Sequence, residues 1–170
     1  MPINTAYSAL EDAVRSYDPG ADVEILKRAY DFATEAHAEQ KRASGEPYII
    51  HPITTAMTLA EMRLPIQIVV AGLLHDVPED TPRTIEQIEK EFGPDVAKLV
   101  AGITKLGKIK YRGIERYIEN LRKMFLAMAS DLRVILIKFA DRLHNLRTLE
   151  ALPPEKQKRI AQETLEIYAP

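Results

Sequence analysis

Apolar residues recur at helical spacing along almost the whole chain of 170 residues, and no segment shows the strict alternation of a β-hairpin. Proline and glycine interrupt this spacing at intervals, as at Pro19-Gly20 and Pro153-Pro154. The spacing predicts helices over residues 7–17, 22–40, 53–62, 65–76, 84–93, 94–106, 115–129, 131–150 and 155–168. We therefore expect an all-α bundle of about eight to nine helices.

The composition narrows the class of protein further. Hydrophobic residues make up 46% of the chain, which is enough for residues 1–170 to form one domain with a substantial core. The chain has no cysteine, which excludes a disulfide scaffold, a thiolate zinc site and a cysteine nucleophile, and which fits a cytoplasmic protein. The 23 Lys and Arg against 25 Asp and Glu argue against DNA or an anionic membrane as partner. No apolar run approaches the ~18 residues of a membrane span.

Two segments between predicted helices have proline-controlled geometry. Residues 44–47 predict a turn, residues 48–50 an extended stretch, and Pro52 the first turn of the following helix. Pro78 disfavours helical geometry at the preceding residue, Val77. We therefore expect residues 79–80 to lie in a turn just beyond the helix that ends near residue 76.

The predicted helix over residues 131–150 has two distinct faces. One row is apolar throughout and comprises Leu132, Leu136, Phe139, Leu143 and Leu146. The opposite row begins apolar and becomes polar, and it comprises Val134, Ile137, Asp141, Asn145 and Thr148. We expect the first half of this helix to be buried on two sides and the polar groups to face the interior or a cleft. Buried polar groups need partners, which either a structural network or a ligand can provide.

Imidazole and carboxylate groups occur at three separate places in the chain. His51 lies at a loop-to-helix junction, His75 and Asp76 follow an apolar helix, and Asp141 lies on the inward row of the helix just described. Two imidazoles and two carboxylates suit manganese, iron, cobalt or zinc at a site with open positions. A His-Asp pair is also common as a helix cap or surface group. Carboxylates at the C-terminal end of a helix are unfavourable without a cation, which favours the metal.

Three long motifs, in this order along the chain, resemble the hydrolase domain of the RelA/SpoT homologues, which belongs to the HD phosphohydrolase superfamily. They are residues 44–52 (SGEPYIIHP), residues 75–81 (HDVPEDT) and residues 138–149 (KFADRLHNLRTL). The resemblance covers about residues 20 to 170. It implies an all-α HD-domain fold.

The resemblance also implies the roles of ten residues. One manganese ion, with other divalent ions as alternatives, is held by His51, His75, Asp76 and Asp141. The residues that position or activate the attacking water are Glu79 and Asp80. The guanine end of the substrate is contacted by Arg42 and Ser44, and the nucleotide pocket is lined by Asn145 and Thr148.

The activity implied by the resemblance is metal-dependent hydrolysis of the 3′-pyrophosphate of (p)ppGpp, the stringent-response alarmone. The products are GDP or GTP and pyrophosphate. The resemblance further implies an N-terminal fragment of a longer protein that carries synthetase and C-terminal regulatory domains. A bound divalent ion and a nearby carboxylate are suited to such a reaction, since they supply an electrophile, a nucleophile and a base.

Three positions depart from the family pattern, and two other functions remain open. Ala43 stands where a lysine often follows the arginine, Pro78 replaces an aliphatic residue, and Leu146 replaces a methionine. The first alternative function is that of an HD phosphohydrolase acting on another nucleotide or on NADPH. The second is that of a regulatory module that binds a nucleotide without cleaving it.

The remaining polar residues receive smaller roles. An anionic substrate needs cations, for which Arg42, Lys105 and residues 108–112 are candidates, although a basic loop is more often simply solvated. We expect His37 to be a hydrogen-bonded structural residue and His144 to support the metal site. The expected roles of Arg142 and Tyr48 are an ion pair and packing, respectively.

Overall fold

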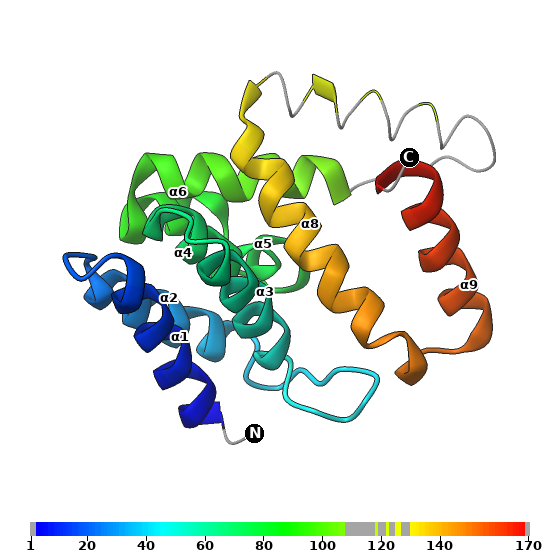
Figure 1. Ribbon diagram of the computed structural model, residues 1–170, viewed down its shortest axis with the longest axis horizontal. Helices are drawn as coiled ribbons and strands as arrows, with labels where there is room; N and C mark the ends of the chain where they lie inside the picture. Colours follow the sequence, from blue (N-terminus) through cyan, green and yellow to red (C-terminus); the bar gives the residue numbers. More distant parts are fainter. Residues whose placement is uncertain (1–2, 108–117, 119–121, 123–124, 127–129, 169–170) are drawn as a thin grey trace.

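The computed structural model describes residues 3–107, 118, 122, 125–126 and 130–168, and it confirms the all-α fold (Figure 1). The main helices are α1 (Ile3–Tyr17), α2 (Val23–Ala36), α3 (Ile50–Glu61), α4 (Ile66–Leu74), α5 (Val77–Asp80), α6 (Ile85–Gly107), α8 (Leu132–Arg147) and α9 (Pro154–Glu163). Two short segments, η1 (Leu149–Ala151) and η2 (Thr164–Tyr168), complete the described helical structure. None of the described helices has the length and the apolar character that crossing a membrane requires.

Helix α4 forms the centre of the core. All of its residues except Gln67 are buried, and it contacts α2, α3, α6 and α8. Such an apolar surface on every side is typical of a helix surrounded by others. Helices α1 and α2 lie on one side of this centre and α8 on the other, with α9 beyond α8 (Figure 1).

The structure confirms the local signals that start and divide helices. The Asp22 carboxylate accepts hydrogen bonds from the backbone N–H groups of residues 24 and 25 and so caps α2. Thr84 and Gln87 form the predicted capping box, since each side chain accepts from the other residue's backbone N–H, at 3.4 and 2.9 Å. Gly93 has φ of 85° and separates the two halves of α6, as its position before Pro94 predicts.

Several predicted boundaries are wrong, and α1 begins at Ile3 instead of near residue 7. Helix α2 ends at Ala36 instead of near residue 40, because the chain turns at residues 37–39. Residues 48–50 are not extended: Ile49 has φ of −54° and ψ of −23°, and Ile50 is already the first residue of α3. Residues 79–80 belong to the single helical turn α5, in which Pro78 occupies the first turn, where its missing N–H removes no helical hydrogen bond.

Helix α8 is buried on one face. Val134, Ile137 and Asp141 of the predicted inward row are buried. The opposite apolar row is largely exposed, with relative accessibilities of 57% at Leu132 and 43% at Phe139, so the expectation of burial on two sides is wrong. Among the described residues α8 packs mainly on α3, α4 and α6, and the ion pair of Arg142 with Glu163 of α9 leaves Leu132 and Phe139 exposed.

The helix predicted over residues 115–129 and most of the predicted basic loop lie outside the described residues, apart from residues 118, 122 and 125–126. The predicted ligand positions all lie in described segments. The fold can therefore be followed from its core to the candidate site.

Candidate metal centre

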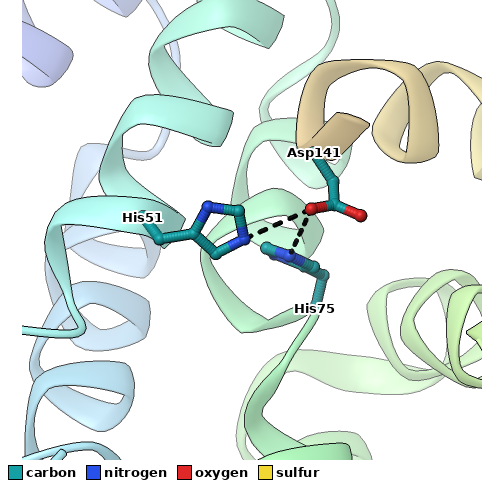
Figure 2. Close-up of side chains that lie close together, drawn as sticks. All are labelled: His51, His75 and Asp141. Carbon is teal, nitrogen blue, oxygen red and sulfur yellow. Dashed lines mark ion pairs between the residues drawn. The ribbon is translucent and has the colours of Figure 1, made fainter. Parts of the chain in front are cut away.

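Three helices bring three of the predicted ligands, His51, His75 and Asp141, to one place (Figure 2). His51 lies in the first turn of α3, and Asp141 lies in the middle of α8. His75 caps the C-terminus of α4, and Asp76 follows it at the start of α5. The close packing of α4 against both α3 and α8 explains why residues so distant in the sequence meet.

The facing atoms of these four side chains have the spacing of ligands to one ion. The Nε2 atom of His51 lies 3.2 Å from Asp76 Oδ2 and 3.3 Å from Asp141 Oδ1. The Nε2 atom of His75 lies 3.1 Å from the other oxygen of Asp76 and 3.9 Å from Asp141 Oδ1. Two donor atoms that each lie ~2.1 Å from a metal, at right angles to one another, are ~3.0 Å apart. His51, His75 and Asp141 therefore have the spacing of ligands to one ion, and Asp76 lies within 3.2 Å of both imidazoles.

The hydrogen bond of His75 fixes which of its nitrogen atoms faces the site. Its Nδ1–H donates to the backbone carbonyl of Gly72 at 2.7 Å. Its Nε2 atom is buried and makes no hydrogen bond to any residue that the structure describes. In a neutral ring this nitrogen carries a lone pair, which points at the carboxylates of Asp76 and Asp141. A lone pair opposite two carboxylates needs a cation between them, either a proton or a metal ion.

A second histidine fixes the orientation of His51. The Nδ1 atoms of His51 and His144 are 2.6 Å apart, and both side chains are buried. Because only one of the two nitrogens can accept, a His51 that keeps its Nε2 lone pair for a metal must donate through Nδ1–H to His144. This contact agrees with the expected supporting position of His144. Metal-binding histidines commonly donate through the nitrogen that does not bind the metal.

The electrostatics of the cluster favour charged carboxylates. Burial alone would raise the pKa of Asp76, but the imidazoles of His75 and His51 outweigh it and hold that pKa well below its usual value. The pKa of Asp141 is likewise lowered despite burial, chiefly by Lys138, whose Nζ lies 2.7 Å from Oδ2. Burial lowers the pKa of His75, but the two carboxylates outweigh it and raise the pKa to about 9.

Buried anions with lowered pKa values are stable only beside cations. In Figure 2 the rings of His51 and His75 both face the same Asp141 oxygen, and the three ligand atoms lie within 4.8 Å of one another. This buried cluster of nitrogen and oxygen donors indicates binding of a divalent metal.

The predicted acidic pair lies on α5, shortly after the predicted ligand Asp76. Partial burial, together with Asp76 and Asp80, raises the pKa of Glu79, although Lys138 opposes this effect. A raised pKa suits a carboxylate that accepts a proton near neutral pH. Asp80 is held through both its side chain and its backbone: Oδ2 accepts from the Tyr48 hydroxyl at 2.7 Å, and the carbonyl accepts from Gln40 Nε2 at 2.6 Å.

A cleft of about 190 Å³ lies beside the cluster. It is lined by Lys41, Arg42, Ala43, Ser44, Tyr48, Asn145, Thr148, Ala151 and Leu152, which include every residue predicted for the nucleotide pocket. Arg42 donates to Asn145 Oδ1 at 3.0 Å and to the Thr148 hydroxyl at 3.4 Å. Asn145 in turn donates to Asp141 Oδ1 at 2.6 Å, so this side chain connects the cleft to a ligand of the candidate metal centre.

The sequence analysis overlooked Lys41, Ala151 and Leu152 as residues that line the cleft. Lys41 precedes Arg42 in the same loop, and that adjacency was an available signal, whereas Ala151 and Leu152 had none. Tyr48 packs against His37, as expected of a packing residue, but its hydroxyl also contacts the carboxylates of Asp76 and Asp80. Burial and these carboxylates raise the pKa of Tyr48, so the phenol keeps its proton and donates a hydrogen bond.

The smaller expectations have mixed outcomes. His37 is buried and hydrogen-bonded to Gln40, and Arg142 pairs with Glu163 at 3.3 Å, as expected. Ser44 is exposed, and its hydroxyl donates to Glu46 at 3.0 Å. Of the candidate loop cations, Lys105 is exposed and residues 108–112 lie outside the described segments.

Comparison with known proteins agrees with this geometry. Over 165 residues the chain is 52% identical to the bifunctional (p)ppGpp synthase/hydrolase SpoT of Escherichia coli K12, a match covering 96% of this chain and 24% of the relative. It is 55% identical over 147 residues to a guanosine-3′,5′-bis(diphosphate) 3′-pyrophosphohydrolase of Aquifex aeolicus, covering 86% of this chain and 21% of the relative. The chain thus spans about a quarter of the length of these relatives.

A solved structure is similar as well. It is described as a metazoan ortholog of SpoT that hydrolyses ppGpp, and it matches with a TM-score of 0.69 and 28% identity over 84% of this chain and 83% of that one. These similarities confirm the resemblance found in the sequence motifs. Residues 29–170 also match the HD domain family over most of the chain. The chain therefore belongs to the HD domain family.

Proposed function

We propose that this domain is a metal-dependent hydrolase that removes the 3′-pyrophosphate of (p)ppGpp. The observation that carries the proposal is the convergence of two imidazoles and two carboxylates beside the cleft that contains Arg42 and Asn145. The names of the relatives with more than 50% identity supply the substrate class. In the reaction, water forms a bond to phosphorus, the bond from phosphorus to the ribose 3′ oxygen breaks, and that oxygen takes up a proton.

The metal ligands in this proposal are His51, His75, Asp76 and Asp141, and the ion is Mn²⁺. Two imidazoles with two carboxylates match its preference for mixed nitrogen and oxygen donors. When bound, such an ion supplies a Lewis acid for a phosphoryl oxygen and lowers the pKa of a coordinated water.

Residues of the protein supply the base, orient the attacking water and add positive charge. Glu79 is the proposed base that receives the proton of the attacking water, which its raised pKa favours. Asp80 orients that water, since Tyr48 and Gln40 fix its carboxylate and its backbone. Lys138 holds Asp141 in place and adds a positive charge beside the site of a polyanionic substrate.

The nucleotide occupies the cleft in this proposal. Its volume is below the ~300 Å³ typical of pockets that enclose a drug-sized ligand, so it suits one portion of a nucleotide. Arg42 and Ser44 contact the guanine end, and Asn145 and Thr148 line the path from the cleft to Asp141. A base held there leaves the 3′-pyrophosphate on the side of the ligand cluster.

The domain is further proposed to be part of a longer protein with synthetase and C-terminal regulatory domains. The support is that the matched relatives are about four times as long and that one of them is named a bifunctional synthase/hydrolase.

The experiment is a product analysis of purified domain with Mn²⁺ and ppGpp, in parallel with NADPH and deoxynucleoside triphosphates. We expect GDP and pyrophosphate from ppGpp. Glu79→Gln should lose about 10²–10⁴-fold in turnover, as expected for an acid–base group. Asp80→Asn should also lose turnover, because the attacking water is no longer oriented, and both variants should still bind the nucleotide. A domain that binds ppGpp without cleaving it would be a regulatory module, and preferential cleavage of another compound would replace the proposed substrate.

A further inference from the structure

We propose that Tyr48 is a positioning residue that fixes Asp80 relative to Asp76 through its hydroxyl and forms a wall of the cleft through its ring. The proposal rests on the proposed function for the roles of Asp80 and of the cleft. In this proposal Tyr48 contributes both to the candidate metal centre and to the cleft. The sequence favoured packing over base stacking for Tyr48.

The hydroxyl lies between two carboxylates that belong to different parts of the site. It is 2.8 Å from Asp76 Oδ2 and 2.7 Å from Asp80 Oδ2. The same oxygen of Asp76 lies 3.2 Å from His51 Nε2, so the phenol contacts a group at the centre of the ligand cluster. A single hydroxyl thus sets the separation of a metal ligand and the residue proposed to orient the attacking water.

The ring is held in one orientation by its neighbours. It stacks on buried His37, with centroids 4.5 Å apart and planes inclined by 19°. The Arg42 guanidinium lies 5.7 Å from the ring centroid, and the His51 ring meets it edge-on at 6.1 Å. Such contacts leave little room for ring rotation, so the position of the hydroxyl is set by packing.

The backbone of Asp80 is held from the same direction. Gln40 Nε2 donates to the Asp80 carbonyl at 2.6 Å, and Gln40 Oε1 accepts from His37 Nδ1–H at 2.8 Å. His37 therefore supports Asp80 by two routes, one through Gln40 and one through the Tyr48 ring. Because α5 is a single helical turn, these contacts from outside it determine where the Asp80 carboxylate lies.

The test separates the hydroxyl from the ring. Tyr48→Phe keeps the ring and removes the hydroxyl, so we expect Mn²⁺ affinity to fall about tenfold and kcat for ppGpp to fall at least about tenfold, with KM within about twofold of the parent. Tyr48→Leu also removes the wall of the cleft, so KM should rise as well. The metal affinity is measured by calorimetry with Mn²⁺ alone on metal-free protein.

Tyr17→Phe is the matched control, because the Tyr17 hydroxyl also donates a partly buried hydrogen bond, to the Leu64 carbonyl at 2.7 Å, away from the site. This variant should keep the parent's metal affinity and kcat. A second comparison tests whether Tyr48 acts through Asp80: once Asp80→Asn is present, adding Tyr48→Phe should lower kcat by less than about twofold.

An unchanged Mn²⁺ affinity or an unchanged kcat in Tyr48→Phe overturns the proposal, and so does an equal loss in Tyr17→Phe or a fully additive double variant. If the parent does not cleave ppGpp at all, the proposed function fails, and the calorimetric comparison of Tyr48→Phe with Tyr17→Phe still decides whether the hydroxyl positions Asp76. The two failures are therefore distinguishable.

Discussion

The Nδ1–H of His75 donates to the Gly72 carbonyl, and the opposite nitrogen faces Asp76 and Asp141. Without a metal, the carboxylates keep a proton on this ring and raise its pKa to about 9. A metal ion can bind only to the neutral ring, so metal and proton compete for the same lone pair.

This competition predicts a pH-dependent metal affinity. Below about pH 9 each unit of increasing pH should strengthen Mn²⁺ binding by up to about tenfold, and binding near pH 7 should release about one proton. Calorimetry in buffers with different ionisation enthalpies measures both quantities. An affinity that is constant between about pH 6.5 and pH 9 would show that His75 is not protonated in the metal-free protein.

His144 offers a second prediction at the scale of a residue. An asparagine at this position can present an acceptor oxygen close to the place of Nδ1, whereas a leucine has the volume without an acceptor. We expect His144→Leu to weaken Mn²⁺ binding by about 10- to 100-fold and His144→Asn to recover much of that loss. Equal affinities in the leucine variant and the parent would mean that the 2.6 Å contact with His51 has no part in orienting the ligand.

At the scale of elements, signals carried by adjacent residues could be predicted and contacts between elements could not. The Asp22 cap and the Gly93 break depend on neighbours in the sequence, and both are correct. The end of α2 depends on His37 and Gln40, which are bound to Tyr48 and Asp80 from other segments. The sequence pattern of α2 contains no sign of those contacts, so the end of the helix could not be predicted from it.

The buried face of α8 also could not be predicted from the sequence, because the helix has two apolar rows and nothing in its own residues indicates which row is buried.

The structure predicts a contrast between two aliphatic residues of α8. Ile137→Ala removes a fully buried side chain and should lower the free energy of unfolding by about 2–5 kcal/mol. Leu143→Ala, at a position 36% exposed, should lower it by less than about 1 kcal/mol.

Chemical denaturation of the two variants in parallel measures this difference, and the slope of each transition checks that both unfold in a single step. Equal losses, or a larger loss at Leu143, would contradict the assignment of the buried face of α8.

At the scale of the whole molecule, the site exists because α4 packs between α3 and α8. Residue types alone identified His51, His75, Asp76 and Asp141 as possible ligands, and the sequence motifs related them to a known family. The structure added what types and spacing do not contain: which nitrogen of each ring faces the site, and how Asn145 joins the cleft to Asp141.

Charge also has to be understood at this scale. The chain carries a formal net charge of −2, yet the proposed substrate is a polyanion. Positive groups lie where such a substrate would bind: Lys41 and Arg42 line the cleft, and Lys138 pairs with Asp141. The local arrangement of these cations outweighs the overall charge, since exposed charges more than about 10 Å apart are largely screened.

The most direct test of the account is a titration of metal-free domain with Mn²⁺ in which bound metal and ppGpp turnover are followed together. We predict that turnover is absent without metal and rises in proportion to occupancy of one site per chain, with GDP and pyrophosphate as products, and that Asp141→Ala abolishes both. Full turnover in metal-free protein, or metal binding that survives the loss of Asp141 unchanged, would contradict it.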